Sequence, residues 1–313
     1  MTYAVVGTGG VGALCAAALS RGGADVACLT TPRHVEPLTA NGLVIETGQG
    51  DYEAPVKIAT ANAHDIGPVN AVIVAVKLYQ LDDVIASLSP LLTPETLIVS
   101  LLNGIEAPSR LAEAYPSAHV VPGITTMVST LIEPGRARSL GPVPGLQLAD
   151  HALDGTGSEQ IARLVDSFDS SLIRAFATSD IDHLLWRKFA LITTFGGVCA
   201  LADAPIGAVR ENPGTRALID RSLAEARSVA TAAGVNLSED DIEGIVSALM
   251  AMDPDSTTSL QRDIAQGKRG ELDGLNGRLV ERAHALGIDV AFHETVCAVL
   301  DLRLARSASA LVD

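Results

Sequence analysis

The sequence predicts an α/β protein with an N-terminal Rossmann dinucleotide-binding domain followed by an all-helical domain. Two observations support this prediction. A glycine-rich turn follows the first apolar run directly, and it reads Gly7-Thr8-Gly9-Gly10-Val11-Gly12. After about Thr178 the pattern changes, and the remaining apolar residues recur almost entirely at helical spacing. We therefore expect a nucleotide-binding domain over residues 1–178 and a helical substrate or dimerisation domain over residues 179–313.

The opening residues supply the first strand, the first helix and the second strand of the Rossmann domain. Tyr3–Val6 is a short apolar run, Ala13–Ser20 is rich in Ala and Leu, and Asp25–Leu29 is a second apolar run. A G-x-G-x-x-G sequence between a strand and a helix, with another strand soon after, is typical of dinucleotide-binding folds. The alternative is a turn whose glycines are only structural.

Three glycines of this turn have separate physical roles. Gly7 permits the tight turn, Gly9 lets the backbone approach a pyrophosphate, and Gly12 lets the helix pack close to the strand. The free N–H groups and partial positive charge of the helix N-terminus then favour phosphate binding. The predicted phosphate-binding stretch consists of Gly7, Thr8, Gly9, Gly10, Val11 and Gly12.

The end of the second strand favours NADP over NAD. A fold that prefers NAD usually has Asp or Glu here, bonded to the ribose 2′-hydroxyl. This chain has Leu29-Thr30-Thr31 instead, and Arg33 and His34 follow closely. A cation without a nearby acid suits a 2′-phosphate, so we predict contacts from Thr31 and Arg33. In the alternative interpretation, Arg33 only caps or solvates the next helix.

Two later strands direct polar residues to the edge of the sheet where ligands bind. Ala71–Val76 is a continuous apolar run, as expected for a strand buried on both faces, and Lys77 follows it. Thr96–Leu102 is a similar run that ends at Asn103. Doubly wound folds bind ligands at the carboxyl ends of their strands, so we expect Lys77 and Asn103 to face the same crevice as the glycine turn.

The other elements complete the two domains. Residues 119–148 are predicted to form an antiparallel extension of the sheet. Further strands are expected at 43–46, 55–60 and 172–176, and helices at 80–88, 105–114 and 158–168. The second domain is expected to contain helices at 179–200, 212–233, 240–252, 272–286 and 292–304.

Composition narrows the class of protein. The chain has 313 residues, 48% of them hydrophobic, and a formal net charge of −15, which argues against nucleic-acid and anionic-membrane partners. The four cysteines are widely spaced in apolar sequence, and neither C-x-x-C nor H-E-x-x-H occurs, so we predict no metal site. We recognise no signal peptide, and the longest apolar stretch is too short to span a membrane, so we expect a cytoplasmic enzyme.

Several motifs together resemble one known family. They are the glycine turn, Val76-Lys77, Asn103-Gly104, Leu185-Trp186-Arg187-Lys188-Phe189, Ser259-Leu260-Gln261-Arg262-Asp263-Ile264, Gly270-Glu271-Leu272-Asp273 and Asn276-Gly277. On these residues, and over nearly its whole length, the chain resembles ketopantoate reductase (2-dehydropantoate 2-reductase). The resemblance implies NADPH-dependent reduction of a 2-oxo acid to a 2-hydroxy acid, with 2-dehydropantoate as the first candidate and pantothenate biosynthesis as the pathway.

The resemblance also implies roles for individual residues. Lys188 resembles the general acid, and Glu271 the carboxylate that orients the substrate or the lysine. Asn103 would position Lys188 and the nicotinamide, so Asn103 and Glu271 are expected beside the cofactor as well. Ser259 would bond the substrate carboxylate, and Lys77 would contact the cofactor. An ammonium suits the reaction, because a hydride added to a ketone leaves an alkoxide that needs a proton and a positive neighbour.

Each of these roles has a structural alternative. Lys188 by itself suits a solvated position on an amphipathic helix. Glu271 suits the first turn of the helix that follows it, and Ser259 suits the N-cap of the helix that continues through Leu260. We expect Asp263 and Asn276 to be structural and not catalytic.

The chain departs from the family pattern at the substrate. The family has Asn four and eight residues after the lysine, where this chain has Ile192 and Gly196. Losing such contacts without compensation costs about 1–3 kcal/mol each. The wall of the site formed by Ile192 and Gly196 is therefore expected to be apolar and roomier. At Thr31 the family commonly has arginine, and Arg33 is expected to replace it.

Three functions remain open at this point, besides a secondary-amine or sugar-acid dehydrogenase of similar two-domain architecture, which the Trp186-Arg187-Lys188 sequence disfavours. The first is reduction of 2-dehydropantoate, and the second is reduction of a bulkier or more apolar 2-oxo acid. The third is a non-catalytic NADP-binding sensor, which the missing amides favour and the retained Lys188 and Glu271 disfavour. A homodimer is a further expectation, based on the apolar surface of the helical domain.

Overall fold

The first compact unit of the computed structural model, which describes residues 1–309, is built on an eight-stranded sheet. The unit comprises residues 1–102 and 106–181. The strand order is β5-β2-β1-β6-β7-β8-β11-β12, and the pairs are parallel except β8 with β11. The strands are β1 (Thr2–Val6), β2 (Asp25–Leu29), β5 (Ile58–Thr60), β6 (Ala71–Val74), β7 (Leu97–Ser100), β8 (His119–Thr125), β11 (Gly145–Ala149) and β12 (Arg174–Thr178). The predicted Rossmann architecture is confirmed.

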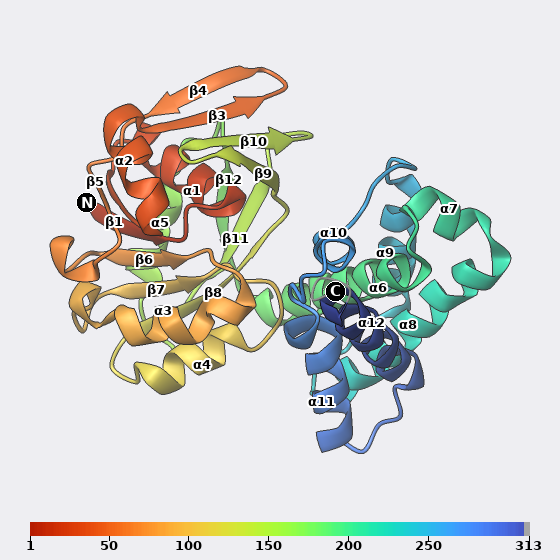
Figure 1. The fold of residues 1–313 in the computed structure, drawn as a ribbon. Coiled ribbons are helices and arrows are strands. Elements are labelled where there is room, and N and C mark those ends of the chain that lie inside the picture. Colours follow the sequence, from red (N-terminus) through yellow and green to blue (C-terminus); the bar gives the residue numbers. More distant parts are fainter. Residues whose placement is uncertain (310–313) are drawn as a thin grey trace. The chain divides into compact units, whose positions relative to one another are not determined.

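The helices of this unit cover the sheet (Figure 1). They are α1 (Gly10–Arg21), α2 (Pro32–Asn41), α3 (Leu81–Ser87), α4 (Ala107–Ala114) and α5 (Ser158–Asp166). Every residue of β6 and of β7 is buried, which explains why these strands read as continuous apolar runs. The order of the strands reverses at β1 and β6, and the glycine turn follows β1 directly.

A second sheet was not predicted. It has the order β4-β3-β10-β9 and consists of β3 (Leu43–Thr47), β4 (Gly50–Ala54), β9 (Val128–Glu133) and β10 (Arg136–Leu140). The antiparallel extension expected over residues 119–148 is therefore right only for β8 and β11. β9 and β10 leave the large sheet because they pack on α1, which contacts all four strands of the small sheet.

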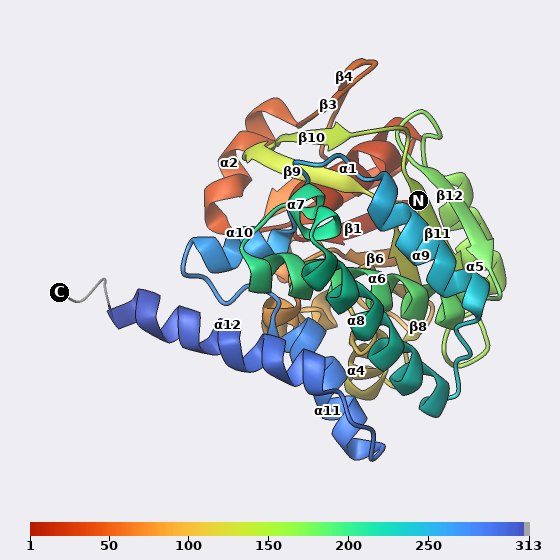
Figure 2. The ribbon, with the colours of Figure 1, turned by 90° about the vertical axis from the view of Figure 1, so that its right-hand side faces the viewer.

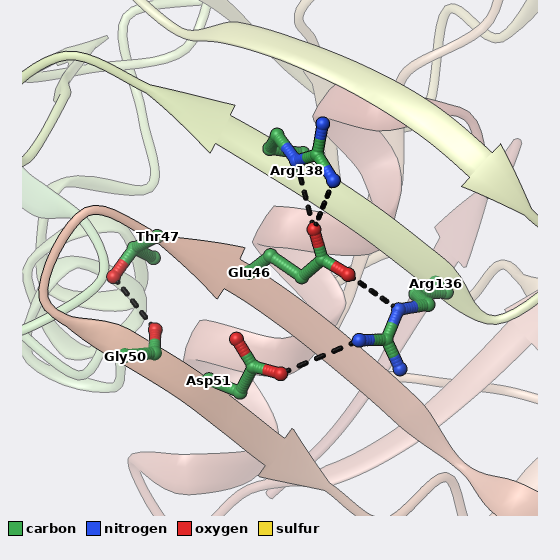
Figure 3. Close-up of polar contacts among 6 residues, drawn as sticks. All are labelled: Glu46, Thr47, Gly50, Asp51, Arg136 and Arg138. Atoms are coloured by element: carbon green, nitrogen blue, oxygen red, sulfur yellow. Dashed lines mark hydrogen bonds and ion pairs between the residues drawn. The ribbon is translucent and has the colours of Figure 1, made fainter.

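Ion pairs tie β3 to β10 on the outer face of the small sheet (Figure 3). Glu46 on β3 accepts hydrogen bonds from Nε of Arg136 at 2.6 Å and Nε of Arg138 at 2.8 Å. Arg136 also reaches Asp51 on β4, at 3.4 Å. The guanidinium groups, that of Arg138 first, hold the pKa of Glu46 below its usual value. The parallel pairing of β3 with β10 is thereby fixed in register, with Glu46 opposite Arg138.

The second compact unit is all helical, as predicted, and comprises residues 103–105 together with the chain from Asp182. Its central helix is α6 (Ile181–Ala202), and Figure 2 shows α12 beside α8 and α11. The remaining elements are α7 (Ile206–Glu211), α8 (Pro213–Ala232), α9 (Glu239–Ala251), α10 (Ser259–Ala265), a π-helical turn (Asp273–Gly277), α11 (Arg278–Ala285) and α12 (Ala291–Ser309). The helix expected over 272–286 thus begins as a π-helical turn.

α6 is the core helix of this unit. Among the described residues it is the one helix long and apolar enough to cross a membrane, yet 61% of its most apolar window is buried in protein. Trp186, the only tryptophan of the chain, packs edge-on against Phe189 at 5.8 Å between ring centroids, and Arg282 stacks on its ring. The fluorescence of Trp186 will therefore report on the folding of the helical unit.

A buried histidine also lies in this core. His293 on α12 has no exposed surface, and its Nε2 lies 3.2 Å from the backbone carbonyl of Ser222 on α8. Burial lowers its pKa to about 4, and the hydrogen bond to Ser222 opposes this shift only in part. The fold therefore holds the imidazole neutral.

We predict that His293 makes stability depend on pH. The unfolded chain binds a proton at a pKa near 6.5, whereas the folded protein resists protonation down to about 4. Stability is therefore fully present above about pH 6.5 and is lost as the pH falls toward 4. Between pH 7 and 5 this one group contributes a loss of about 2 kcal/mol. Urea unfolding followed by Trp186 fluorescence measures it, and His293→Gln should remove that part of the slope. Thr295→Ala, on the exposed face of α12, removes no titratable group and should leave the slope unchanged.

Candidate functional site

The glycine turn has the geometry that a pyrophosphate requires. Gly7 adopts φ +89°, in the region that favours glycine. A Cβ on Gly12 would lie 1.8 Å from the carbonyl oxygen of Gly7, so only glycine allows α1 to start so close to the turn. A Cβ on Gly9 would meet nothing within 4 Å, so this side of the backbone is open. The residues present thus fit a dinucleotide phosphate at the N-terminus of α1.

The turn also contacts the small sheet, which the sequence did not reveal. A Cβ on Gly10 would lie 2.4 Å from the carbonyl oxygen of Ser129 on β9. Gly10 is therefore needed for the close packing of the turn against β9. Val11, the next residue, is partly buried in the first turn of α1. No local pattern signals this contact, because Gly10 and Ser129 are far apart in the chain.

Three polar side chains connect the turn to the end of β2. The Thr8 hydroxyl lies 2.5 Å from the Thr30 hydroxyl and 3.1 Å from Nδ1 of His34 on α2. His34 is almost fully buried, and burial, with a smaller contribution from Arg33, lowers its pKa. From the sequence, Thr30 and His34 were placed near the end of the second strand, but neither was assigned to the site. The one available signal was a histidine at the start of a helix directly after β2.

The predicted 2′-phosphate residues lie on the surface of this unit. Thr31 precedes α2 as its N-cap residue, and Thr31 and Arg33 are both exposed. Lys77 is partly buried after β6, and its backbone N–H donates to Oε1 of Gln80 at 3.2 Å. These positions place two cations in the same unit as the glycine turn, on the chain segments that follow β2 and β6.

The reacting group predicted in the helical unit is a lysine in an unusual environment. Lys188 is partly buried on α6. Burial lowers the pKa of its ammonium to about 8, and the charge of Glu271 opposes this shift by raising the pKa. The solvated position considered as an alternative does not describe this side chain.

Glu271 and Asn103 accompany Lys188 in the same unit. Glu271 is only 3% exposed, and its Oε2 accepts a hydrogen bond from Nδ2 of Asn103 at 3.4 Å. Asn103 follows β7 in the sequence, but residues 103–105 group with the helices. Gly270 adopts φ +57°, and a Cβ there would lie 2.6 Å from a carboxylate oxygen of Asp263. Asp263 thus packs directly against the residue that precedes Glu271, in keeping with its expected structural role.

The predicted substrate residues lie on α6 and α10. Ser259 is partly buried in the first turn of α10, but the N-cap is Thr258, whose hydroxyl accepts from the N–H of Gln261 at 3.0 Å. The suggestion that Ser259 caps this helix is therefore wrong. Ile192 is partly exposed, whereas Gly196 is buried, and a Cβ on Gly196 would lie 3.5 Å from Leu260. Leu260 thus occupies part of the room expected at Gly196.

Two family models match most of the chain. The family model described as Ketopantoate reductase PanE/ApbA matches residues 3–148, and the model for its C-terminal part matches residues 180–303. The chain belongs to the ketopantoate reductase family. It is accordingly an NADP-dependent oxidoreductase that acts on CH–OH groups, and the family reduces 2-oxo acids.

Individual relatives cover nearly the whole chain. A 2-dehydropantoate 2-reductase of Caulobacter vibrioides is 29% identical over 96% of this chain and 98% of its own. An uncharacterised oxidoreductase of Bacillus subtilis is 27% identical over the same shares of the two chains. The crystal structure of a ketopantoate reductase of this family from Ralstonia eutropha JMP134 superposes with a TM-score of 0.88 at 27% identity, covering 98% of this chain and 99% of its own.

We predict that two glycines of the turn separate folding from cofactor binding. Gly12→Ala places a Cβ against the Gly7 carbonyl and should destabilise the Rossmann unit by about 1–3 kcal/mol. Gly9→Ala meets open space and should leave the melting temperature unchanged, yet it should weaken NADPH binding, because the Cβ occupies the approach to the pyrophosphate. Circular dichroism and NADPH fluorescence titration measure the two effects. Full-strength NADPH binding by Gly9→Ala would contradict the assignment.

Proposed function

We propose that the protein reduces a 2-oxo acid to a 2-hydroxy acid with NADPH, and that Lys188 is the general acid. The observation that supports this most directly is the partly buried ammonium of Lys188, whose pKa of about 8 suits proton transfer near neutral pH. A solvated lysine with a pKa near 10.5 would be a weaker proton donor. The first candidate substrate is 2-dehydropantoate, which the curated relative from Caulobacter vibrioides reduces according to its name.

The proposed roles follow from the chemistry of the side chains. NADPH, when bound, supplies a hydride to the ketone carbon. Lys188 stabilises the negative charge that develops on the ketone oxygen and donates a proton to it. Glu271 keeps Lys188 protonated by raising its pKa, and Asn103 orients Glu271 through its amide. Ser259 donates a hydrogen bond to the carboxylate of the substrate.

The cofactor is proposed to bind along the first unit. Gly7, Thr8, Gly9, Gly10, Val11 and Gly12 would surround the pyrophosphate. Thr31, Arg33 and Lys77 would contact the adenosine part with its 2′-phosphate, and Asn103 and Glu271 would lie near the nicotinamide. A cytoplasmic homodimer that serves pantothenate biosynthesis completes this proposal.

A second candidate substrate is favoured by one feature of α6. Ile192 is partly exposed and apolar, where the family pattern described above has an amide. Ile192 and Leu260 would contact the variable side chain of a 2-oxo acid, so an alkyl or aryl group larger than that of 2-dehydropantoate is the alternative. The fold leaves this choice open, because a D-mandelate dehydrogenase shares it with a TM-score of 0.86 at 20% identity over 98% of this chain.

We predict that Lys188→Ala lowers kcat by about 10²–10⁴-fold, because the new alkoxide loses its proton donor. The wild-type rate of reduction should also fall as the pH rises past about 8, where Lys188 loses its proton. Steady-state assays with NADPH on 2-dehydropantoate and on 2-oxo acids with longer alkyl or aryl side chains measure both effects and identify the substrate.

Lys268→Ala is the matched control for this prediction. Lys268 is exposed and bonds Gln266 at 2.8 Å, so its removal should leave kcat unchanged. Turnover that survives Lys188→Ala would exclude the mechanism. NADPH binding without turnover of any 2-oxo acid would favour the sensor function instead.

We predict that Arg33 sets the preference for NADPH. Arg33→Ala removes the exposed cation after β2 and should raise the Kd for NADPH about tenfold, since a charged hydrogen bond contributes about 1.5–3 kcal/mol. The Kd for NADH should not change, because NADH lacks the 2′-phosphate. Fluorescence titration with both nucleotides measures the ratio, and Arg174→Ala, at another exposed arginine of this unit, is the control. An equal loss for both nucleotides would refute the assignment.

A further inference from the structure

The helical unit contains a buried amide that the proposed reaction does not use. Asn276 has no exposed surface and lies in the π-helical turn Asp273–Gly277. Its Nδ2 donates to the backbone carbonyl of Thr193 on α6 at 3.1 Å and to Nδ1 of His293 on α12 at 3.0 Å. One side chain therefore connects three elements of the unit.

These hydrogen bonds fix the orientation of both side chains. Because Nδ1 of His293 accepts from Asn276, the ring proton is on Nε2, where the Ser222 carbonyl accepts it at 3.2 Å. A flipped Asn276 amide would direct its oxygen at the Thr193 carbonyl, so only one orientation is compatible. In that orientation Oδ1 of Asn276 is buried and has no hydrogen-bond partner among the described residues. An unpaired buried oxygen is costly, and such exceptions in native proteins often serve a function.

The sequence of α6 accommodates this amide at one position. A Cβ on Gly197 would lie 2.8 Å from Nδ2 of Asn276 and 3.5 Å from Val296. Glycine in the middle of a helix is otherwise unfavourable. Gly197 thus lets the π-helical turn approach α6 closely enough for Asn276 to reach the Thr193 carbonyl.

The connection lies close in the chain to both proposed reacting groups. On α6, Thr193 follows Lys188 by about one and a half helical turns. On the other segment, the Glu271 carbonyl accepts from the N–H of Leu275 at 3.0 Å, and the Leu272 carbonyl accepts from Gly277 at 3.0 Å. The backbone that carries Glu271 is therefore bonded into the turn that carries Asn276. Single π-helical turns of this kind occur frequently at functional sites.

We propose that Asn276, held in place by His293, is a positioning residue that fixes the separation of Lys188 and Glu271. The catalytic role of Lys188 and Glu271 rests on the function proposed above, whereas the separation of these two residues does not. Glu271 is the carboxylate that acts on Lys188, and the neutral His293 ring adds no charge. Glu225 on α8 accepts from the backbone N–H groups of Phe292 and His293 and so holds the start of α12 in place.

A positioning role for Asn276, unlike a purely structural one, affects the pKa of Lys188. Glu271 raises the pKa of Lys188 against the effect of burial. If the π-helical turn moves away from α6, Glu271 moves away with it, and the pKa of Lys188 falls below its value of about 8. The pKa of Lys188 therefore reports on the separation that Asn276 is proposed to fix.

The first variant is Gly197→Ala, which pushes on the Asn276 amide while improving the helix propensity of α6. Competitive acetylation of the intact protein over a pH series, with the Lys188 peptide quantified by mass spectrometry, gives the pKa without any need for turnover. We expect the pKa of Lys188 to fall by roughly half a unit or more. We also expect kcat to fall about tenfold at unchanged KM for NADPH.

A matched pair at His293 provides the second test. His293→Gln keeps an acceptor for Asn276 and a donor for Ser222, and it should retain the wild-type pKa of Lys188. His293→Leu has a similar volume but no acceptor, and it should behave like Gly197→Ala. The thermal transition of Trp186 fluorescence establishes that each variant is folded, and Thr295→Ala, on the exposed face of α12, serves as the control.

The pKa of Lys188 tests the positioning role of Asn276, and the turnover of 2-oxo acids tests the proposed function. A Lys188 pKa that stays at its wild-type value in folded Gly197→Ala refutes the positioning role, whatever happens to kcat, and so does an equal pKa shift in His293→Gln and His293→Leu. If His293→Leu does not fold, Gly197→Ala alone decides. Should no 2-oxo acid be turned over, the proposed function fails while the labelling still tests the geometry.

Discussion

The chemistry proposed for this protein depends on a partly buried ammonium whose pKa also responds to a carboxylate. Burial disfavours the charged form of Lys188 and so lowers its pKa. The negative charge of Glu271 favours the charged form and reverses part of that shift. The result is an ammonium that is still mostly charged at neutral pH and yet releases its proton more readily than a solvated lysine, as the proposed general acid requires. Neither group achieves this alone, so the helical unit must hold two distant parts of the chain at a fixed separation.

Glycine solves the same steric problem in both units. In the Rossmann unit, Gly12 lets α1 start against the Gly7 carbonyl, and a Cβ would be 1.8 Å from that oxygen. In the helical unit, Gly197 lets the Asn276 amide reach the backbone of α6. At both positions glycine lowers the helix propensity, but it allows another segment of the chain to lie close to the helix. By our proposals, the close contact at Gly12 shapes a phosphate site, and the close contact at Gly197 fixes the distance between the reacting groups.

The sequence predicted those features that local patterns determine. Each of these features has a pattern within a short stretch of sequence. They are the glycine turn, the buried apolar runs of β6 and β7, and the helical spacing of apolar residues in the second unit. The small sheet was missed because Arg136 pairs with Val44 and Arg138 with Glu46, and no local pattern marks such distant partners. Ser259 and Thr258 are both good N-caps, and only the backbone geometry identifies Thr258 as the cap. The space taken by Leu260 beside Gly196 likewise follows from tertiary packing.

The reaction class and the identity of the substrate depend on different residues. Lys188, Glu271 and Ser259 are proposed to act on the ketone and the carboxylate, which all 2-oxo acids share. Ile192 and Leu260 are proposed to meet the side chain, which differs from one 2-oxo acid to the next. An apolar pocket distinguishes groups that differ by a methylene only weakly, whereas an amide placed for a hydroxyl rejects ligands that lack it strongly. Since this chain has Ile192 where the family pattern described above has an amide, its discrimination against 2-oxo acids without a hydroxyl should be weaker than that of a site built around such an amide.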